Sequence, residues 1–157
     1  MGRIYEPDFN VDNYVDRVTK VMDIRGVFHR LASKLIEENK TDSAKAVLDR
    51  IVHIMPDNKF PFDYFFIPII EDYHKINQQA VADSLIKITF NNYREECEFY
   101  KALDNDKLHN IEIQRNLGLA YYSLMQLSEQ TDNEDLKTEL TQYVQTIMPV
   151  LDTKYFR

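Results

Sequence analysis

The sequence is poor in the residues that build tight turns. Its 157 residues include only three glycines and five prolines, whereas a β-rich fold needs many of both at its turns. Tryptophan is absent, so phenylalanine and tyrosine supply the whole aromatic content. These features favour a helical fold whose core packs phenylalanine and tyrosine rings on aliphatic side chains.

Cysteine, basic runs and long apolar runs are also scarce. The single cysteine, Cys97, excludes an internal disulfide, and its acidic neighbours Glu96 and Glu98 disfavour the thiolate that a nucleophile needs. No stretch reaches the roughly 18 apolar residues of a membrane span, and residues 1–7 show no apolar signal segment. A net charge of −7 without a dense basic run argues against nucleic acid as a partner.

Motifs for catalysis and metal binding are missing as well. The chain has no phosphate-binding glycine loop, no nucleophile elbow and no paired metal ligands. Its histidines, which are far apart, are expected to be structural: His29, His53, His74 and His109. Carboxylate pairs such as Glu37–Glu38 and Glu71–Asp72 are expected on solvated helix faces. We therefore predict no enzyme activity, no cofactor and no metal for this chain.

The strongest pattern that is present is a spaced series of apolar and small residues. It consists of Phe28, Leu31, Ala32, Leu35, Ala44, Leu48, Ile51 and Pro56. The spacing resembles the tetratricopeptide repeat, a pair of antiparallel helices that stacks with its neighbours. The resemblance implies an all-α fold, a right-handed superhelix of helical hairpins. Small residues at 32 and 44 would let the two helices approach closely, and Pro56 would end the second helix.

The same pattern divides the chain into a single helical-repeat domain, 1–157. The expected parts are an extended arm (1–10), an N-terminal helix (11–24), repeat 1 (25–56), repeat 2 (62–100) and an atypical terminal helix pair (107–149). Ala82 matches Ala44 at an offset of 38 residues, slightly longer than the usual repeat of about 34. Gly26 is expected at a bend, and Thr89 and Arg94 depart from the repeat pattern.

Helix starts and ends are predicted from capping residues. Thr41 or Asp42 is expected to cap the second helix of repeat 1, and Asn77 the second helix of repeat 2. Thr131 with Glu134 fits a capping box. Pro68 must lie in the first turn of its helix or kink it.

The aromatic segment 59–68 admits two interpretations. Its rings either form a contact patch for a partner or a membrane interface, or they fill the seam between the first two helix pairs. We favour the second interpretation, with at most one or two rings exposed.

Laying the repeat frame on the chain predicts a concave groove on the first helices of the hairpins. The candidate groove residues are His29, Ser33, Tyr64, Glu71, His74, Arg115 and Tyr122. Their mixture of aromatic, amphoteric and charged side chains suits an extended peptide segment. The alternative is that the arm, residues 3–20, folds back and fills the groove itself.

Several stretches also resemble one particular protein group. They are Gly2-Arg3, Pro7-Asp8, Asp12-Asn13 and Arg17, residues 28–32, Leu35-Ile36, residues 43–49, Met55-Pro56, residues 61–65 and Pro68. Together they are similar to the soluble C-terminal region of bacterial multi-span membrane proteins with a glycosyltransferase-like domain related to protein O-mannosyltransferases. The resemblance covers residues 2–100 well and the last third loosely. It implies an extramembrane tail without the transferase residues, with the periplasmic side as the favoured location and the cytoplasmic side as the alternative.

Two classes of function follow. The first is a non-catalytic module that binds a protein or peptide segment. The second is a stand-alone helical protein that associates with copies of itself and has no ligand groove. The first is the prediction, because the repeat pattern is typical of partner-binding scaffolds.

Overall fold

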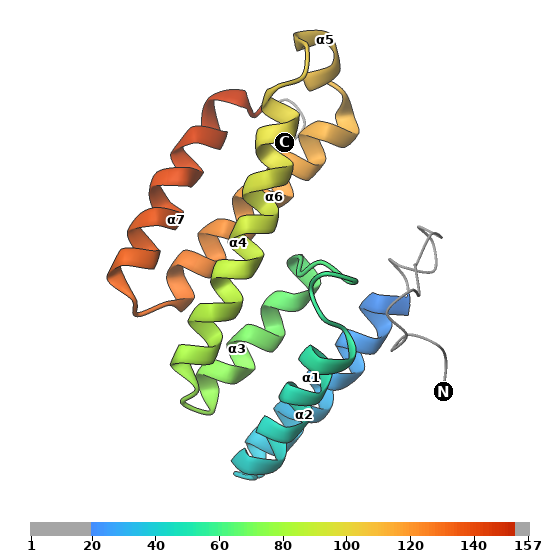
Figure 1. Cartoon of the computed structure of the whole chain (residues 1–157), viewed down its shortest axis with the longest axis vertical. Helices are drawn as coiled ribbons and strands as arrows, with labels where there is room; N and C mark the ends of the chain where they lie inside the picture. Colours follow the sequence, from blue (N-terminus) through green and yellow to red (C-terminus); the bar gives the residue numbers. More distant parts are fainter. Residues whose placement is uncertain (1–19, 153–157) are drawn as a thin grey trace. The chain divides into compact units, whose positions relative to one another are not determined.

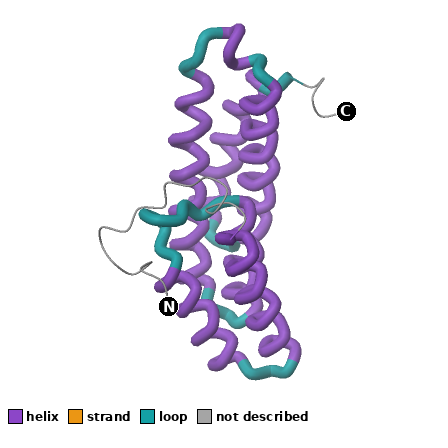
Figure 2. The backbone as a smooth tube through the Cα atoms, turned by 90° about the vertical axis from the view of Figure 1, so that its right-hand side faces the viewer, coloured by secondary structure: helices purple, strands orange, loops and turns teal. Residues whose placement is uncertain are grey.

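The structure, a computed structural model, describes residues 20–152. Across these residues it has seven α-helices, two 3-10 helices and no strand (Figures 1 and 2), which confirms the predicted all-α class. Within this part of the chain, no helix is long and apolar enough to cross a membrane. The expected arm (1–10) and most of the N-terminal helix (11–24) lie outside the described residues.

The chain divides into two compact units. The described part of the first unit is residues 20–79, and that of the second unit is residues 80–152. The boundary falls inside the predicted second repeat, 62–100. Its two helices therefore belong to different units, and both their pairing and the single repeat array stay predictions.

Three α-helices make up the first unit. α1 (Val21–Glu37) and α2 (Thr41–Ile54) form an antiparallel hairpin, which matches the helix pair expected between residues 25 and 56 (Figure 1). The 3-10 helix η3 (Tyr64–Phe66) leads into α3 (Ile67–Lys75), which packs against both α1 and α2. Ala32 and Ala44 are fully buried, as the close approach of paired helices requires.

The turns that end α1 and α3 have the same geometry. Asn39 and Asn77 both have a φ of 59°, a left-handed conformation that asparagine tolerates better than most residues. After α1, the amides of Asn39 and Lys40 donate to the carbonyls of Ile36 and Leu35 at 2.9 and 2.8 Å. After α3, the amides of Asn77 and Gln78 donate to those of His74 and Tyr73, both at 2.9 Å. Both are Schellman motifs, and they recur at the predicted offset of 38 residues.

These turns correct two predicted caps. Asn77 does not cap the helix that follows it but ends α3, and neither Thr41 nor Asp42 is the N-cap of α2. The N-cap is Lys40, whose side chain makes no capping hydrogen bond. Because Lys40 also completes the Schellman motif of α1, the chain passes from one helix to the next with no residue left over for a separate side-chain cap.

Two expectations for α1 are wrong. The helix runs without interruption from Val21 through Gly26 to Glu37, so Gly26 marks no bend between a helix ending at 24 and a repeat starting at 25. The physical reason is that Arg25, next to Gly26, is held on the buried face of the helix by bonds described below. Leu31 belongs to the predicted core series, yet half of its side chain is exposed.

The aromatic segment before α3 is mostly internal. Phe60, Phe62 and Phe66 are buried, whereas Tyr64 and Phe65 are partly exposed. Phe62 stacks on Phe66 with ring centroids 3.7 Å apart. This confirms the expectation that at most two rings remain exposed. Pro68 lies in the first turn of α3 and causes no break.

The second unit contains three long helices and one short one. They are α4 (Gln79–Lys101), α5 (Asn105–Leu108), α6 (Ile111–Gln130) and α7 (Glu134–Ile147), followed by the 3-10 helix η4 (Met148–Val150). The α6–α7 hairpin matches the predicted terminal pair (Figure 1). Side chains tie α4 to both: the Asn116 amide donates to the Tyr100 hydroxyl at 2.8 Å, and the Tyr143 hydroxyl donates to Glu98 at 2.9 Å.

The predicted capping box at Thr131 and Glu134 does not form. The N-cap of α7 is Asn133, whose side chain accepts from the Leu136 amide. Thr131 is buried instead, and its hydroxyl donates to Asp83 of α4 at 2.6 Å. The Thr131 oxygen still accepts from the Asn133 amide at 3.1 Å, so Thr131 precedes the N-cap and connects the start of α7 to α4. Thr89 is buried too, with its hydroxyl donating to the Leu85 carbonyl at 2.9 Å.

Candidate functional site

A buried carboxylate organises the face of the first unit where α1 meets α3. Asp72 on α3 is fully buried, and its oxygens bind three side chains. His29 Nδ1 lies 2.7 Å from Oδ2, Lys75 Nζ lies 2.9 Å from Oδ1, and the Ser33 hydroxyl lies 3.2 Å from Oδ2. We call these four residues the Asp72 cluster. The expectation that the Glu71–Asp72 pair lies on a solvated face is wrong for Asp72, because its donors compensate its desolvation.

The Asp72 cluster leaves two of its polar side chains, His29 and Lys75, partly exposed at the surface. Since Nδ1 of His29 lies against Asp72, Nε2 is the ring's other hydrogen-bonding nitrogen, and about a third of the side chain is exposed. Lys75 has half of its side chain exposed and uses one of its three N–H donors on Asp72. A ring nitrogen and an ammonium held by the two oxygens of one carboxylate suit the hydrogen-bonding groups of a peptide backbone.

The cluster has the residue types of a serine hydrolase triad but not its geometry. In that triad the carboxylate binds one ring nitrogen of the histidine and the serine binds the other. Here Ser33 Oγ lies 3.4 Å from Nδ1, the nitrogen that also binds Asp72. Ser33 therefore sits beside the carboxylate, away from Nε2, where a base would have to accept its proton.

The other groove candidates of the first unit lie on η3 and α3. Tyr64, at the start of η3, is partly exposed and packs edge-on against Phe65 at 5.5 Å. Glu71 and His74 on α3 are half-buried. The Nε2 atom of His74 is buried and has no hydrogen-bond partner. Among the five candidates in this unit, His29 and Ser33 contact each other, with Ser33 Oγ 3.4 Å from His29 Nδ1.

The remaining candidates, Arg115 and Tyr122, lie on α6 in the second unit. Both are exposed, and they are seven residues apart, so they occupy one helix face. Tyr122 packs edge-on against Tyr121 at 5.6 Å. Because the candidates are divided between two units, a groove that joins all seven stays a prediction.

Arg25 is a second buried charged residue in the first unit, and like Asp72 it is not among the predicted site residues. Arg25 on α1 is 1% exposed, and it bonds Asp63 and the Phe60 carbonyl at 2.8 and 2.7 Å. Its guanidinium also lies over the Phe66 ring, 5.2 Å from the centroid. Burial lowers the pKa of Arg25 and raises that of Asp63, while their mutual attraction opposes both shifts. Arg25 fixes the loop between α2 and α3, which positions Asp72.

A signal for both missed residues exists in the spacing. Arg25 precedes Phe28 by three residues and Ala32 by seven, and Asp72 follows Ile69 by three. Helical periodicity therefore places each on the inward face of its helix. A charged residue at an inward helix position must be buried and paired, so this rule would have identified both Arg25 and Asp72.

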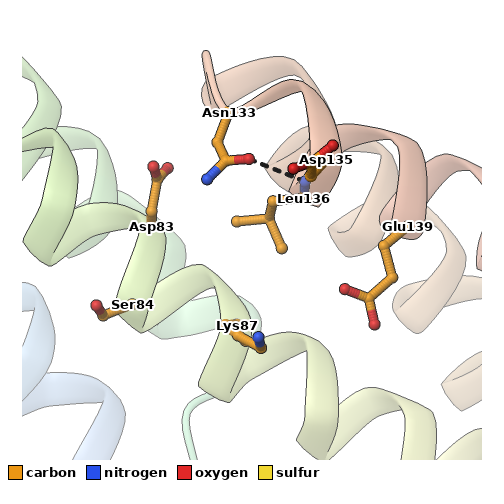
Figure 3. A pocket seen from close by; sticks show the side chains of 7 residues that line it. All are labelled: Asp83, Ser84, Lys87, Asn133, Asp135, Leu136 and Glu139. Carbon is orange, nitrogen blue, oxygen red and sulfur yellow. Dashed lines mark hydrogen bonds between the residues drawn. The ribbon is translucent and has the colours of Figure 1, made fainter.

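The second unit has an open pocket of about 320 Å³ between α4 and the start of α7 (Figure 3). Its lining comes from Asp83, Ser84 and Lys87 on one side and Asn133, Asp135, Leu136 and Glu139 on the other. Asp83 is already engaged by Thr131. The lining is predominantly acidic and exposed, and no grouping of three or more histidine, cysteine or carboxylate side chains within residues 20–152 is arranged to hold a metal ion.

Cys97 on α4 is fully buried. Burial, and then the charge of Glu96, raises the pKa of its thiol to about 12. The direction agrees with the sequence prediction, but burial contributes more than the acidic neighbours that the prediction invoked. A thiol with this pKa is protonated at neutral pH and is a poor nucleophile.

Comparisons with known proteins place no further constraint on the site: no family model matches the chain, and no curated protein or solved structure matches it significantly.

Proposed function

We propose that this chain is a non-catalytic module that binds an extended segment of another protein. The observation that carries the proposal is the Asp72 cluster, where a fully buried carboxylate fixes His29 and Lys75 at the surface. Groups held in place before binding lose less conformational entropy when a ligand arrives. A surface with one fixed imidazole nitrogen and one fixed ammonium suits the backbone of a peptide.

The repeated turn geometry supports the repeat architecture behind this proposal. Asn39 and Asn77 form equivalent Schellman motifs, and Ala44 and Ala82 are both fully buried at the same offset. We propose that the hairpins stack into a right-handed superhelix, with α1 and α3 as its inner helices. Small-angle scattering from the intact chain tests this: a curve that requires independently moving halves contradicts the stacked array.

The binding proposal is tested with peptides selected from a random display library against the intact chain. Affinities are then measured by fluorescence anisotropy with the variants His29→Gln and Lys75→Gln. We expect at least one variant to weaken binding about fivefold or more, because each loses a fixed hydrogen-bonding group. Lys34→Gln on α1 is the matched control, since Lys34 is exposed and pairs with Glu37 outside the cluster.

Circular dichroism melting of each variant separates loss of the site from loss of the fold. If the selected peptides bind both variants as tightly as they bind the original chain, the peptide-binding surface lies outside the Asp72 cluster. A library that gives no binder at all would contradict the proposed function.

We further propose that the module is an extramembrane, periplasmic tail of a glycosyltransferase-like membrane protein. The support is the sequence resemblance over residues 2–100. Gene context tests it: many membrane spans encoded upstream in the same reading frame are the expected result. An in-frame stop directly upstream would contradict the assignment.

One observation favours self-association as the second candidate function. Val27 and Leu31 lie one turn apart on α1, and about half of each side chain is exposed. Apolar side chains grouped on an exposed helix face are common in association surfaces. Sedimentation velocity over a wide range of concentrations decides this. A concentration-dependent dimer that Leu31→Glu disperses would favour self-association, and a monomer at all concentrations would exclude it.

A further inference from the structure

The outer face of α6 carries an exposed apolar stripe. Ile111, Leu119 and Tyr122 are 57%, 40% and 62% exposed. Their spacing of eight and then three residues places them on one side of the helix, and Arg115 lies between the first two. We call these four residues the α6 stripe. It covers three helical turns, or about 17 Å.

This stripe is a second apolar face on a helix that already has a buried one. Leu117, Leu124 and Leu127 are completely buried on the other side of α6. A helix at the surface of a soluble domain normally turns polar residues outward. The exposed side chains of the stripe add up to roughly 300 Å², which reaches the lower end of the patch sizes that mark interaction sites.

Arg115 gives the stripe its specificity. It is exposed, and among residues 20–152 it makes no hydrogen bond or ion pair, although Glu112 stands three residues before it. Arg94 and Lys101 in the same unit do pair with carboxylates. An unpaired guanidinium flanked by apolar side chains is arranged to take a carboxylate in a bidentate bond.

We propose that the α6 stripe binds an amphipathic helix of another protein, whose apolar face contains one carboxylate that pairs with Arg115. Glu112 is exposed beside the stripe and Glu129 is exposed beyond its C-terminal end, so basic residues at the matching positions of that helix complement the net charge of −7. Tyr122, held edge-on by Tyr121, supplies an aromatic anchor with little freedom to lose. This inference rests on the proposed function. It names the kind of partner that Arg115 and Tyr122, two residues of the predicted groove, would bind.

A second copy of the chain fits the stripe less well. A stable dimer buries about 800 Å² on each partner, more than twice what the stripe offers. In an antiparallel self-contact centred on the stripe, Arg115 would face Leu119 of the second copy, and its guanidinium would stay unpaired. A single short helix that carries one carboxylate contacts this one face of α6 and pairs with Arg115.

The test uses a designed probe of about 18 residues. It is a helical peptide with leucines spaced to meet Ile111, Leu119 and Tyr122, one central glutamate, and lysines on both flanks. A matched peptide carries glutamine in place of the glutamate. Binding to the intact chain is measured by fluorescence anisotropy for the original sequence and for Arg115→Gln, Tyr122→Ala and the control Arg50→Gln, an exposed arginine on α2.

We expect the glutamate peptide to bind the original chain and the Arg50→Gln control equally. Arg115→Gln should weaken it about tenfold, whereas the glutamine peptide should be bound more weakly and should not respond to that substitution. Tyr122→Ala should weaken both peptides. This double-mutant cycle isolates the carboxylate–Arg115 pair from the apolar contacts.

Three results would overturn the inference. They are no binding of either peptide, binding that does not respond to Arg115→Gln or Tyr122→Ala, and a dimer that Leu119→Asp disperses. The Asp72 cluster separates this inference from the proposed function. His29→Gln should leave the affinity of the designed peptide unchanged. If the α6 stripe fails its test while library-selected peptides still depend on His29, the proposed peptide-binding function stands and only this inference is contradicted.

Discussion

Arg25 and Asp72 are charged side chains that the first unit buries almost completely, and each is fixed by groups distant in the sequence. Asp63 and the Phe60 carbonyl hold Arg25 from 38 and 35 residues away, and His29 reaches Asp72 across 43 residues. A buried charge without partners is strongly destabilising. These bonds therefore specify how α1, α3 and the loop before α3 fit together.

Replacing Arg25 by methionine tests the first of these anchors. Methionine keeps the contact with Phe66 but loses the charge-assisted bonds to Asp63 and the Phe60 carbonyl. We expect the free energy of unfolding to fall by about 1.5–3 kcal/mol, measured by urea denaturation. Arg50→Met, an exposed site on α2, is the control. If Arg25→Met and Arg50→Met are equally stable, the buried bonds of Arg25 make no net contribution to the free energy of unfolding.

Tyrosine ionisation should make stability depend on pH at the alkaline end. Burial, and then the hydrogen bond to Glu98, raises the pKa of Tyr143 above its ordinary value. Because the pKa is higher in the folded than in the unfolded chain, the stabilising effect is complete below about pH 10 and is lost as the pH rises through the folded value. Urea denaturation at a series of pH values should show this decline.

Tyr143→Phe removes the ionising hydroxyl and should reduce the alkaline slope, although it also loses the bond to Glu98. Tyr73, whose pKa is raised by burial and by its bond to Asp49, should account for a further part of the slope. A pH profile of Tyr143→Phe that is parallel to that of the original chain would contradict the assignment.

At the scale of the elements, turns explain how the helices of the first unit begin and end. The Asn39 and Asn77 motifs are local, since each uses carbonyls of the helix it ends. Asparagine is tolerated at their positive φ, glycine more so, and alanine is strained there. The same local geometry recurs at the 38-residue offset on which the predicted repeat is based.

Substitution at these turns gives a paired test. Asn39→Ala should lower the free energy of unfolding by about 1 kcal/mol because alanine is strained at this φ, while Asn39→Gly should leave it nearly unchanged. Asn77→Ala and Asn77→Gly should behave in the same way if the turns are equivalent. Chemical denaturation of the four variants is the measurement. A different order of stability at the two sites would refute the equivalence.

At the scale of the whole molecule, the division at Gln79 and Ala80 raises the question of cooperativity. In a stacked repeat protein, stability is approximately a sum of local terms and contacts between neighbours. A change in the first unit should then reach the far end of the chain only weakly. A single globular core would instead spread the effect over all residues.

Ala44→Leu distinguishes these cases. Ala44 is fully buried in α2, so leucine should overpack the α1–α2 hairpin and cost roughly 1–3 kcal/mol. Ala46→Leu on the exposed side of α2 is the control. We expect hydrogen exchange to accelerate in α1, α2 and α3 more than in α6 and α7. Uniform acceleration over residues 20–152 would indicate one cooperative core, and no acceleration would contradict the packing of Ala44.

Some residues of the candidate site could be predicted from the sequence, and others could not. The repeat frame proposed His29 and Ser33 on α1 and Arg115 and Tyr122 on α6, and helical spacing places each pair on one face of its helix. It missed Asp72 and Lys75, since the partners of a carboxylate depend on which helix lies opposite. Thr131 illustrates the same limit: its local pattern fits a capping box, but its hydroxyl binds Asp83 on another helix.

The sequence by itself determined the helical class, the hairpin of α1 and α2 and the burial of Ala44 and Ala82. All of these follow from short-range spacing, small residues and backbone preferences. The tertiary structure decided which polar side chains are inside and what they bind. The physical reason is that burying Arg25 or Asp72 is stable only when donors and acceptors from distant segments meet them, and those segments are brought together by folding itself.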